Sequence, residues 1–197
     1  MVLKPLEERY NGRLCVIHNA ESVGMQNASN IGITATASEF LTIHDDDDSW
    51  CPEFLEACVA FLDDVGADNQ PQGVITHTSW IIEKLMPDRQ LVEVSREPYF
   101  PCDSVTLFQM ASDNMFPPIA FLYRRCMHEN IGMFNQDFTV MGDWDFNLRF
   151  LQQSDIGVIP RELACYHWRE KGTAAAYANT VTAGLEEHAK RTTQMRN

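Results

Sequence analysis

The chain has 197 residues, of which 45% are hydrophobic, and its formal net charge at pH 7 is −13. This length and composition suit a single domain built on one sizeable core. The negative charge argues against a nucleic-acid partner, because a basic surface supplies most of the affinity for nucleic acids.

Strand and helix patterns alternate through the first half of the chain. They predict the end of a helix at 4–11, a strand at 13–18, a helix at 24–37, a buried strand at 39–44, a helix from Pro52 to about Gly66, and strands at 74–83 and 90–95. Alternation of this kind is typical of parallel α/β architecture.

The second half continues this pattern less regularly. It predicts a helix from Asp103 to about Asp113, a strand at 119–124, a helix at 126–131, a helix that begins at Asp143, short strands at 156–159 and 163–166, and a helix at 173–191. We therefore assign residues 1–171 to one α/β domain and residues 172–197 to a C-terminal helix that packs on it.

Two further features of the sequence concern the cellular setting. The sequence shows neither an 18-residue apolar run nor a signal-peptide pattern, which predicts a cytoplasmic protein without a transmembrane segment. A peripheral position at the inner membrane stays open. The six cysteines are scattered without a Cys-x-x-Cys pair, which favours reduced thiols and argues against a zinc site.

Four consecutive aspartates, at 45–48, follow the strand predicted at 39–44. Adjacent ionised carboxylates repel each other, so such a run is stable mainly when it is solvated or neutralised by a cation. Extended backbone would point Asp45 and Asp47 to one side and Asp46 and Asp48 to the other. Carboxylates at the end of a parallel strand lie where open α/β sheets bind ligands, and hard oxygen ligands suit Mg²⁺ or Mn²⁺. The run therefore predicts a divalent-metal site.

Three other interpretations of the aspartate run are open. A solvated acidic loop is the usual fate of a charge run. An EF-hand loop fits Asp45, Asp47, Ser49 and Glu56 but places Trp50 where the sharp turn requires glycine. An aspartate-dependent phosphotransferase also places Asp-x-Asp after a hydrophobic strand and would form an aspartyl-phosphate.

Three segments carry a family pattern in a fixed order. They are 17–52, which includes Asn30, Glu39 and Asp-x-Asp-Asp-x-Trp-x-Pro; 114–135, which includes Asn114, Pro117-Pro118 and Arg124-Arg125; and Gly-Asp-Trp-Asp-Phe at 142–146 with Arg149. Together, over about residues 14–170, they resemble the metal-dependent, family 2 type of glycosyltransferase with the GT-A fold. The resemblance implies a Rossmann-related α/β fold whose mixed, mainly parallel sheet is flanked by helices.

The resemblance also implies which residues bind the donor and the metal. Asp47 is expected to bind Mn²⁺ or Mg²⁺, with Asp45 near both the metal and the ribose. Asp46 and Asn30 complete the expected donor-binding residues. His167 falls near the place where some members put a residue that reaches the metal or the diphosphate; a hydrogen-bonded packing role is the alternative.

The same resemblance makes Asp143 the general base of an inverting transfer. The donor would be a nucleoside-diphosphate sugar, and the acceptor would be a hydroxyl of an unidentified glycan, lipid-linked or protein molecule. A helix N-cap is the alternative role for Asp143. We expect Asp145 to pair with Arg149, four residues later on the same helix.

The chain departs from the family pattern in two places. Gly142 replaces the acidic residue that usually precedes the base. We expect the chain to begin after the βαβ unit that holds the nucleobase in the family, either because it is a fragment or a truncated reading frame or because another chain supplies these strands. Without these strands the sheet would have exposed edges, which predicts that a homo-oligomer or a partner chain covers them. A non-catalytic remnant or binding module is therefore the rival to an active enzyme.

Overall fold

The computed structural model describes residues 3–64 and 70–169, so the helix predicted at 173–191 lies outside the described residues. Six strands form one sheet in the order β1-β5-β3-β6-β2, and β4 pairs with β3 on the edge away from β6, further along the strand than β5. The strands are β1 (Phe40–Leu41), β2 (Ser49–Trp50), β3 (Gly73–Leu85), β4 (Leu91–Tyr99), β5 (Phe121–Arg124) and β6 (Ile156–Arg169).

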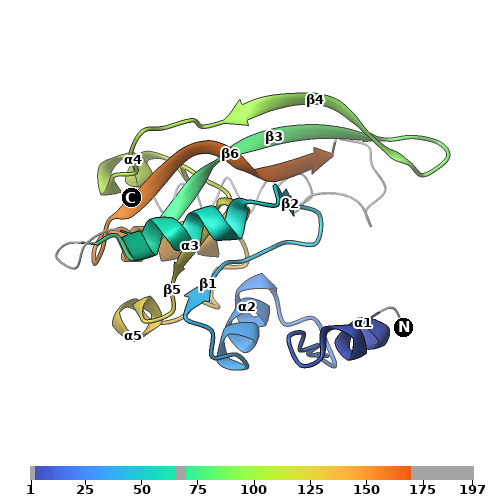
Figure 1. Cartoon of the computed structure of the whole chain (residues 1–197), viewed down its shortest axis with the longest axis horizontal. Helices are drawn as coiled ribbons and strands as arrows, with labels where there is room; N and C mark the ends of the chain where they lie inside the picture. The colour runs from blue at the N-terminus through green and yellow to red at the C-terminus, as the bar shows by residue number, and fades with distance from the viewer. Residues whose placement is uncertain (1–2, 65–69, 170–197) are drawn as a thin grey trace.

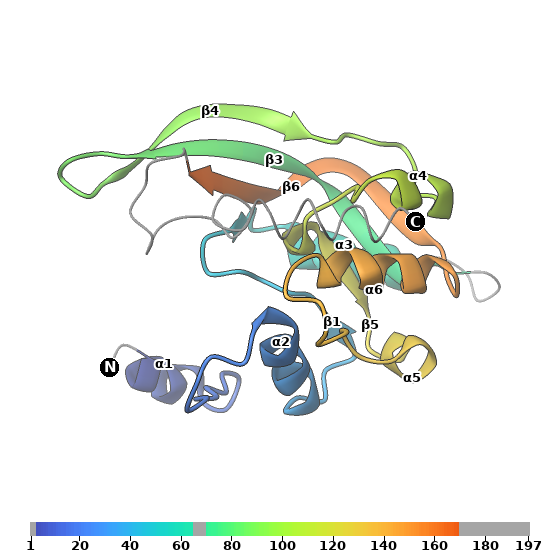
Figure 2. The same cartoon turned by 180° about the vertical axis from the view of Figure 1, so that it is seen from behind.

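Helices cover both faces of this sheet. They are α1 (Leu3–Tyr10), α2 (Met25–Thr34), α3 (Phe54–Asp64), α4 (Leu107–Ser112), α5 (Met127–Ile131) and α6 (Gly142–Leu151), with a short 3₁₀ helix, η1 (Pro118–Ala120). Figures 1 and 2 show α3 in front of the sheet in one view and α6 in front of it from behind. The two helices therefore sandwich the sheet, while α1 and α2 lie beyond β1.

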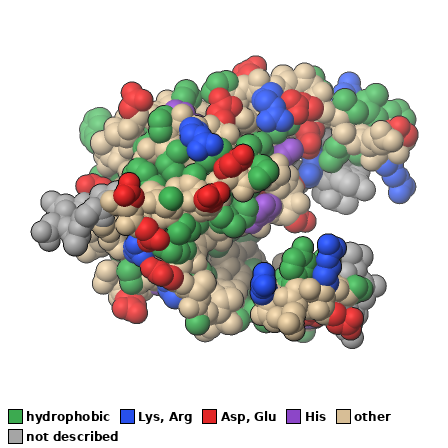
Figure 3. Space-filling model, viewed as in Figure 1, with side chains coloured by type: hydrophobic (Ala, Val, Ile, Leu, Met, Phe, Trp, Pro, Cys, Tyr) green, Lys and Arg blue, Asp and Glu red, His purple; other side chains and the backbone are tan. Residues whose placement is uncertain are grey.

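The core lies between these layers. On α3 the buried residues Phe54, Cys58 and Leu62 recur every four positions, which places them on one face of the helix. On β5 the consecutive residues 121–123 are all buried, as expected for a strand covered on both faces. Figure 3 shows acidic side chains spread among apolar ones on the surface of the face that carries α3.

The mixed α/β sheet flanked by helices is confirmed, but parallel pairing is less extensive than expected. Within the described strands it is confined to β3 and β6, which is also the longest pair. The reason lies in the connections. A tight turn at 86–90 joins β3 to β4 and forces an antiparallel pair, whereas the long connection from β3 to β6 allows a parallel one.

Most predicted elements of the first half are confirmed within a few residues, with two differences. Residues 13–18 do not form a strand; the backbone N–H of Val16 instead donates a hydrogen bond to Glu7 Oε1, at 3.0 Å. The buried strand predicted at 39–44 is limited to Phe40–Leu41, because only these residues pair with β5.

In the second half, the strands predicted at 156–159 and 163–166 are one strand, β6. Ile159 pairs with Thr76 and Glu162 pairs with His77, so Pro160 and the residue after it form a bulge. Proline lacks the N–H that a sheet requires, which explains both the bulge and the predicted gap. The α4 helix begins after Thr106, whose hydroxyl accepts from Gln109 N at 3.2 Å in a capping box, and not at Asp103.

Among the described helices, none is long and apolar enough to cross a bilayer.

Candidate active site

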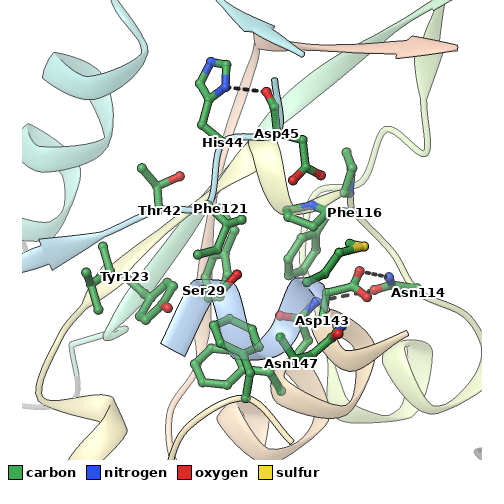
Figure 4. A pocket seen from close by; sticks show the side chains of 18 of the residues that line it. Ser29, Thr42, His44, Asp45, Asn114, Phe116, Phe121, Tyr123, Asp143 and Asn147 are labelled. Atoms are coloured by element: carbon green, nitrogen blue, oxygen red, sulfur yellow. Dashed lines mark hydrogen bonds between the residues drawn. The ribbon is translucent and has the colours of Figure 1, made fainter. Parts of the chain in front are cut away.

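A cavity of about 870 Å³ lies beside the carboxyl end of β1, between α2 and α6. It contains two of the residues predicted to act together, Asp45 from the loop after β1 and Asp143 from the first turn of α6. Aromatic and aliphatic side chains make up most of the rest of the wall (Figure 4). A largely apolar cavity with a few convergent polar groups is the usual form of a ligand site.

The aspartate run forms a turn at this cavity. The backbone N–H of Asp48 donates to the carbonyl of Asp45, at 3.3 Å, before the chain enters β2. The strand-like alternation expected for the four carboxylates is therefore wrong: Asp46 is exposed and Asp48 is buried, although both were expected on the same side. Asp45 and Asp47 are half-buried. The turn gives each carboxylate a different environment.

Asp48 anchors the turn to β6. Its Oδ1 accepts a hydrogen bond from the backbone N–H of His167, at 2.9 Å. Burial raises the pKa of Asp48 to about 7. The neighbouring Asp47 lies 3.5 Å from Arg169 Nη1, also on β6, so two carboxylates of the run are held by one strand.

The imidazole of His167 lies between two strands of the sheet. Its Nε2 is 2.9 Å from Ser49 Oγ on β2, and its Nδ1 is 2.9 Å from Glu83 Oε1 on β3. Both ring nitrogens therefore contact protein groups, which matches the packing alternative for this residue. Trp50 anchors the same loop, because its indole N–H donates to the carbonyl of Ile119 at 2.8 Å.

Asp45 lies in a strongly acidic environment. Burial is the largest cause of its raised pKa, and repulsion from Asp47, Asp143 and Asp46 adds to it. The carboxylates of the run and of α6 therefore interact electrostatically across the cavity. Such a cluster is stabilised by a cation or by protonation.

Asp143 has a defined partner on another element. Its Oδ2 accepts a hydrogen bond from Asn114 Nδ2, at 2.7 Å, as Figure 4 shows. The alternative N-cap role is wrong, because Met141 occupies that position with a positive φ of 62° and makes no side-chain cap bond. The side chain of Asp143 is thus directed to the cavity and to Asn114.

Gly142 has a steric reason to lack a side chain. A Cβ on Gly142 would lie 2.7 Å from Cδ of Gln26 on α2 and closer still to its Cγ and Nε2. Gln26 is buried and lines the cavity, so it fills the space beside Asp143. Position 142 therefore has a glycine, where the family pattern has an acidic residue, because the side chain of Gln26 occupies the adjacent space.

Asn30, predicted to bind the donor, is buried next to the cavity wall and does not line it. Its Nδ2 donates to the carbonyl of Phe134 at 2.8 Å, and its Oδ1 accepts from the N–H of Phe134 at 3.0 Å. Both ends of the amide thus clamp the 131–135 turn onto α2.

The predicted pair of Asp145 and Arg149 is confirmed, with 2.7 Å between Asp145 Oδ2 and Arg149 Nη2. Arg149 also donates to the carbonyls of Ile131, at 2.5 Å, and Met133, at 3.2 Å. Together with Asn30, it fixes the turn that closes one side of the cavity.

Most residues of the cavity wall were not predicted as site residues. Among them are Asn114, which was noted only within the family pattern, Asn147, Tyr99 and Tyr166. The sequence signal for Asn147 was its position four residues after Asp143, on the same helix face. Tyr99 and Tyr166 end up together because β4 and β6 both flank β3, and their rings meet edge to face at 5.7 Å.

The carboxylate oxygens of the aspartate run are ligands that suit a hard cation such as Mg²⁺ or Mn²⁺. Within residues 3–64 and 70–169, no three His, Cys, Asp or Glu side chains converge as a complete metal cage. Mg²⁺ is commonly held by one or two carboxylates together with substrate phosphates rather than by such a cage. Asp45 and Asp47 repel each other, and they are the residues that would hold such a cation, which would supply compensating positive charge.

The chain is similar to known proteins over most of its length. It is 21% identical over 159 residues to an uncharacterized glycosyltransferase, YwdF, of Bacillus subtilis (strain 168), which covers 81% of this chain and 56% of that protein. The crystal structure of S. aureus TarS 1-349 matches with a TM-score of 0.62 and 18% identity, covering 84% of this chain and 47% of that chain. The complex of TarS 1-349 with UDP-GlcNAc matches with a TM-score of 0.61 and 19% identity, covering 89% and 48%.

The structural similarity establishes the GT-A-like fold, and the chain spans about half the length of the relatives it matches. The family model described as "Glycosyl transferase family 2" matches residues 2–132, well over half of the chain. This match covers the aspartate run and the strand and turn up to Gly132. The chain therefore belongs to glycosyltransferase family 2.

Proposed function

We propose that this chain carries the catalytic cavity of a glycosyltransferase that moves a sugar from a nucleoside-diphosphate sugar to an acceptor hydroxyl with inversion. The observation that carries the proposal is the meeting of Asp45 and Asp143 in one cavity, from two separate elements. An inverting transfer needs a base on one side of the sugar and stabilisation of the departing diphosphate on the other.

Asp45 and Asp47 are the proposed metal-binding residues, for Mn²⁺ or Mg²⁺. The bound ion would supply positive charge to the diphosphate that leaves. Asp46 is exposed, which leaves it able to reach the donor. We give His167 the role of supporting the loop, because its imidazole contacts Ser49 and Glu83.

Asp143 is the proposed base. The acceptor oxygen forms a bond to the anomeric carbon while the bond from that carbon to the diphosphate oxygen breaks, and the acceptor proton passes to the Asp143 carboxylate. Attack from the side opposite the leaving group inverts the anomeric configuration. A carboxylate suits this role when it is ionised and within reach of the proton.

The test is a turnover assay. The protein is incubated with Mn²⁺ and UDP-, GDP- or TDP-sugars, with and without simple acceptors, and the released nucleoside diphosphate is measured. Asp143→Asn should reduce release about 100-fold or more. Asp155→Asn, an exposed aspartate outside the cavity, is the matched control and should act like the parent.

The product's anomeric configuration, read by proton NMR, checks inversion. Retention of configuration, or an Asp143→Asn protein as active as the parent, would contradict the proposed mechanism. Nucleotide binding by the parent without any release would instead identify a non-catalytic binding module.

A further inference from the structure

Asn114 is a polar residue of the cavity whose position depends on the tertiary fold. It lies half-buried on the segment between α4 and η1, while Asp143 lies on α6. The 2.7 Å hydrogen bond from Asn114 Nδ2 to Asp143 Oδ2 joins these two elements inside the cavity (Figure 4). The contact is short for a neutral N–H donor and a carboxylate, as charge-assisted hydrogen bonds are.

A second amide fixes the orientation of the first. Asn147 lies one helical turn after Asp143 and is buried, and its Nδ2 is 3.4 Å from Asn114 Oδ1. An Asn side chain presents an acceptor on one side and a donor on the other. Asn147 donates to the oxygen of Asn114 while the nitrogen of Asn114 donates to Asp143, so the two contacts use opposite ends of one amide. A flipped Asn114 would place its oxygen against the carboxylate and lose both contacts.

The backbone around Asn114 restricts it further. Its own N–H donates to Asp113 Oδ1, at 3.0 Å, and Pro117 and Pro118 follow within four residues. Nearby, the indole N–H of Trp144 donates to the carbonyl of Met110 at 2.6 Å and ties α6 to α4. The side-chain amide of Asn114 is thus held on a segment that its neighbours support, as precise positioning of a hydrogen-bond donor requires.

We propose that Asn114 is a positioning residue that holds the carboxylate of Asp143 in its ionised form and in one rotamer, with Asn147 setting the direction of the Asn114 amide. This inference rests on the proposed function, in which Asp143 is the base. The other titratable groups that line the same cavity are His44, Asp45, Tyr99, Asp113, Tyr123 and Tyr166. The charge of Asp45 opposes ionisation of Asp143. A neutral amide suits the role because it favours the ionised carboxylate, whereas Lys or Arg would cancel its charge. A base must be ionised before it can accept the acceptor's proton.

The experiment has one readout that needs no substrate and one that does. Carbon-13 NMR of the full chain follows the titration of the Asp143 carboxyl, assigned by its loss in Asp143→Asn. Asn114→Ala should move the titration midpoint about 0.5 to 1 pH unit upward, since one hydrogen bond to the ionised form is lost. Asn114→Asp, which keeps the shape and adds a second carboxylate, should move it further. Asn147→Ala should produce a smaller shift in the same direction.

The second readout is the pH profile of donor turnover. The acidic limb of the profile should shift with the NMR midpoint. At pH values below that midpoint, kcat should fall about threefold to tenfold in Asn114→Ala, and the KM for the nucleotide-sugar should stay within about twofold. Asn130→Ala, an exposed residue of α5, is the matched control and should leave both readouts unchanged.

An unchanged Asp143 midpoint in Asn114→Ala or in the isosteric Asn114→Asp would overturn the inference. The failure of the proposed function is a separate result, because a chain without turnover still reports the Asp143 midpoint. If Asn114→Ala does not fold, Asn114→Asp and Asn147→Ala decide the question.

Discussion

The contact between Gly142 and Gln26 leads to a prediction in which one substitution changes sign with its background. In Gly142→Ala the new Cβ would lie 2.7 Å from Gln26 Cδ and closer to Cγ and Nε2, so buried atoms must shift. Overpacking of this kind costs about 1–3 kcal/mol, while alanine gains at most about 1 kcal/mol in helix propensity. We expect a net loss of about 1–2 kcal/mol in unfolding free energy.

Such a loss corresponds to a melting temperature about 2–8 °C lower for a domain of this size. In the Gln26→Ala background the space is open, so the same Gly142→Ala change should be neutral or stabilising by up to about 1 kcal/mol. Gly32→Ala is the matched control, because a Cβ on this helical glycine of α2 would meet nothing within 4 Å.

Urea unfolding of the four proteins in this double-mutant cycle gives the coupling energy. We expect at least about 1 kcal/mol of coupling between positions 26 and 142. Additive effects, or a Gly142→Ala protein as stable as the parent, would refute the steric reason for glycine beside Asp143.

Three further predictions concern the turn that closes the cavity. Asn30→Ala should lower the unfolding free energy by about 2–4 kcal/mol, because it leaves the buried N–H and carbonyl of Phe134 without their partner, and urea titration measures this loss. Burial lowers the pKa of His128, so the unfolded chain binds more protons below about pH 6.5; stability should fall on acidification by at most about 1.4 kcal/mol per pH unit, and His128→Gln should flatten that part of the pH profile. Arg149→Ala should cost about 2–4 kcal/mol and show coupling with Asp145→Ala in thermal unfolding.

Each of these predictions has a contradicting outcome. An Asn30→Ala protein within about 0.5 kcal/mol of the parent would mean that the turn finds other partners. A pH profile that is the same in His128→Gln would assign the acid sensitivity to other groups. Additive losses at Arg149 and Asp145 would show that their contact contributes nothing beyond each side chain's other interactions.

The sequence predicts well those features that depend on local spacing. The helical segment that forms α3 and the pairing of Asp145 with Arg149 follow from helical spacing. The same holds for the placement of the aspartate run at the end of β1. These features need no knowledge of which distant segments meet.

Other features depend on contacts between segments far apart in the chain. The bond from Asn114 to Asp143 and the clamp of Asn30 on Phe134 each require the folded arrangement of α2, α6 and the loops between strands. The buried position of Asp48 depends on a turn that replaces the expected extended backbone. The sequence shows that Asn30, Asp48 and Asn114 are polar residues within the family pattern, but it does not show which distant residues they contact.

The central claim is that the aspartate run binds a metal ion that carries a nucleoside diphosphate. Isothermal titration of the protein with UDP, GDP and TDP, with and without Mn²⁺, tests it most directly. We expect at least one nucleotide to bind only with Mn²⁺, and we expect Asp47→Asn to weaken this binding about tenfold or more. Failure of all three nucleotides to show metal-dependent binding, or equal affinity in Asp47→Asn, would contradict it.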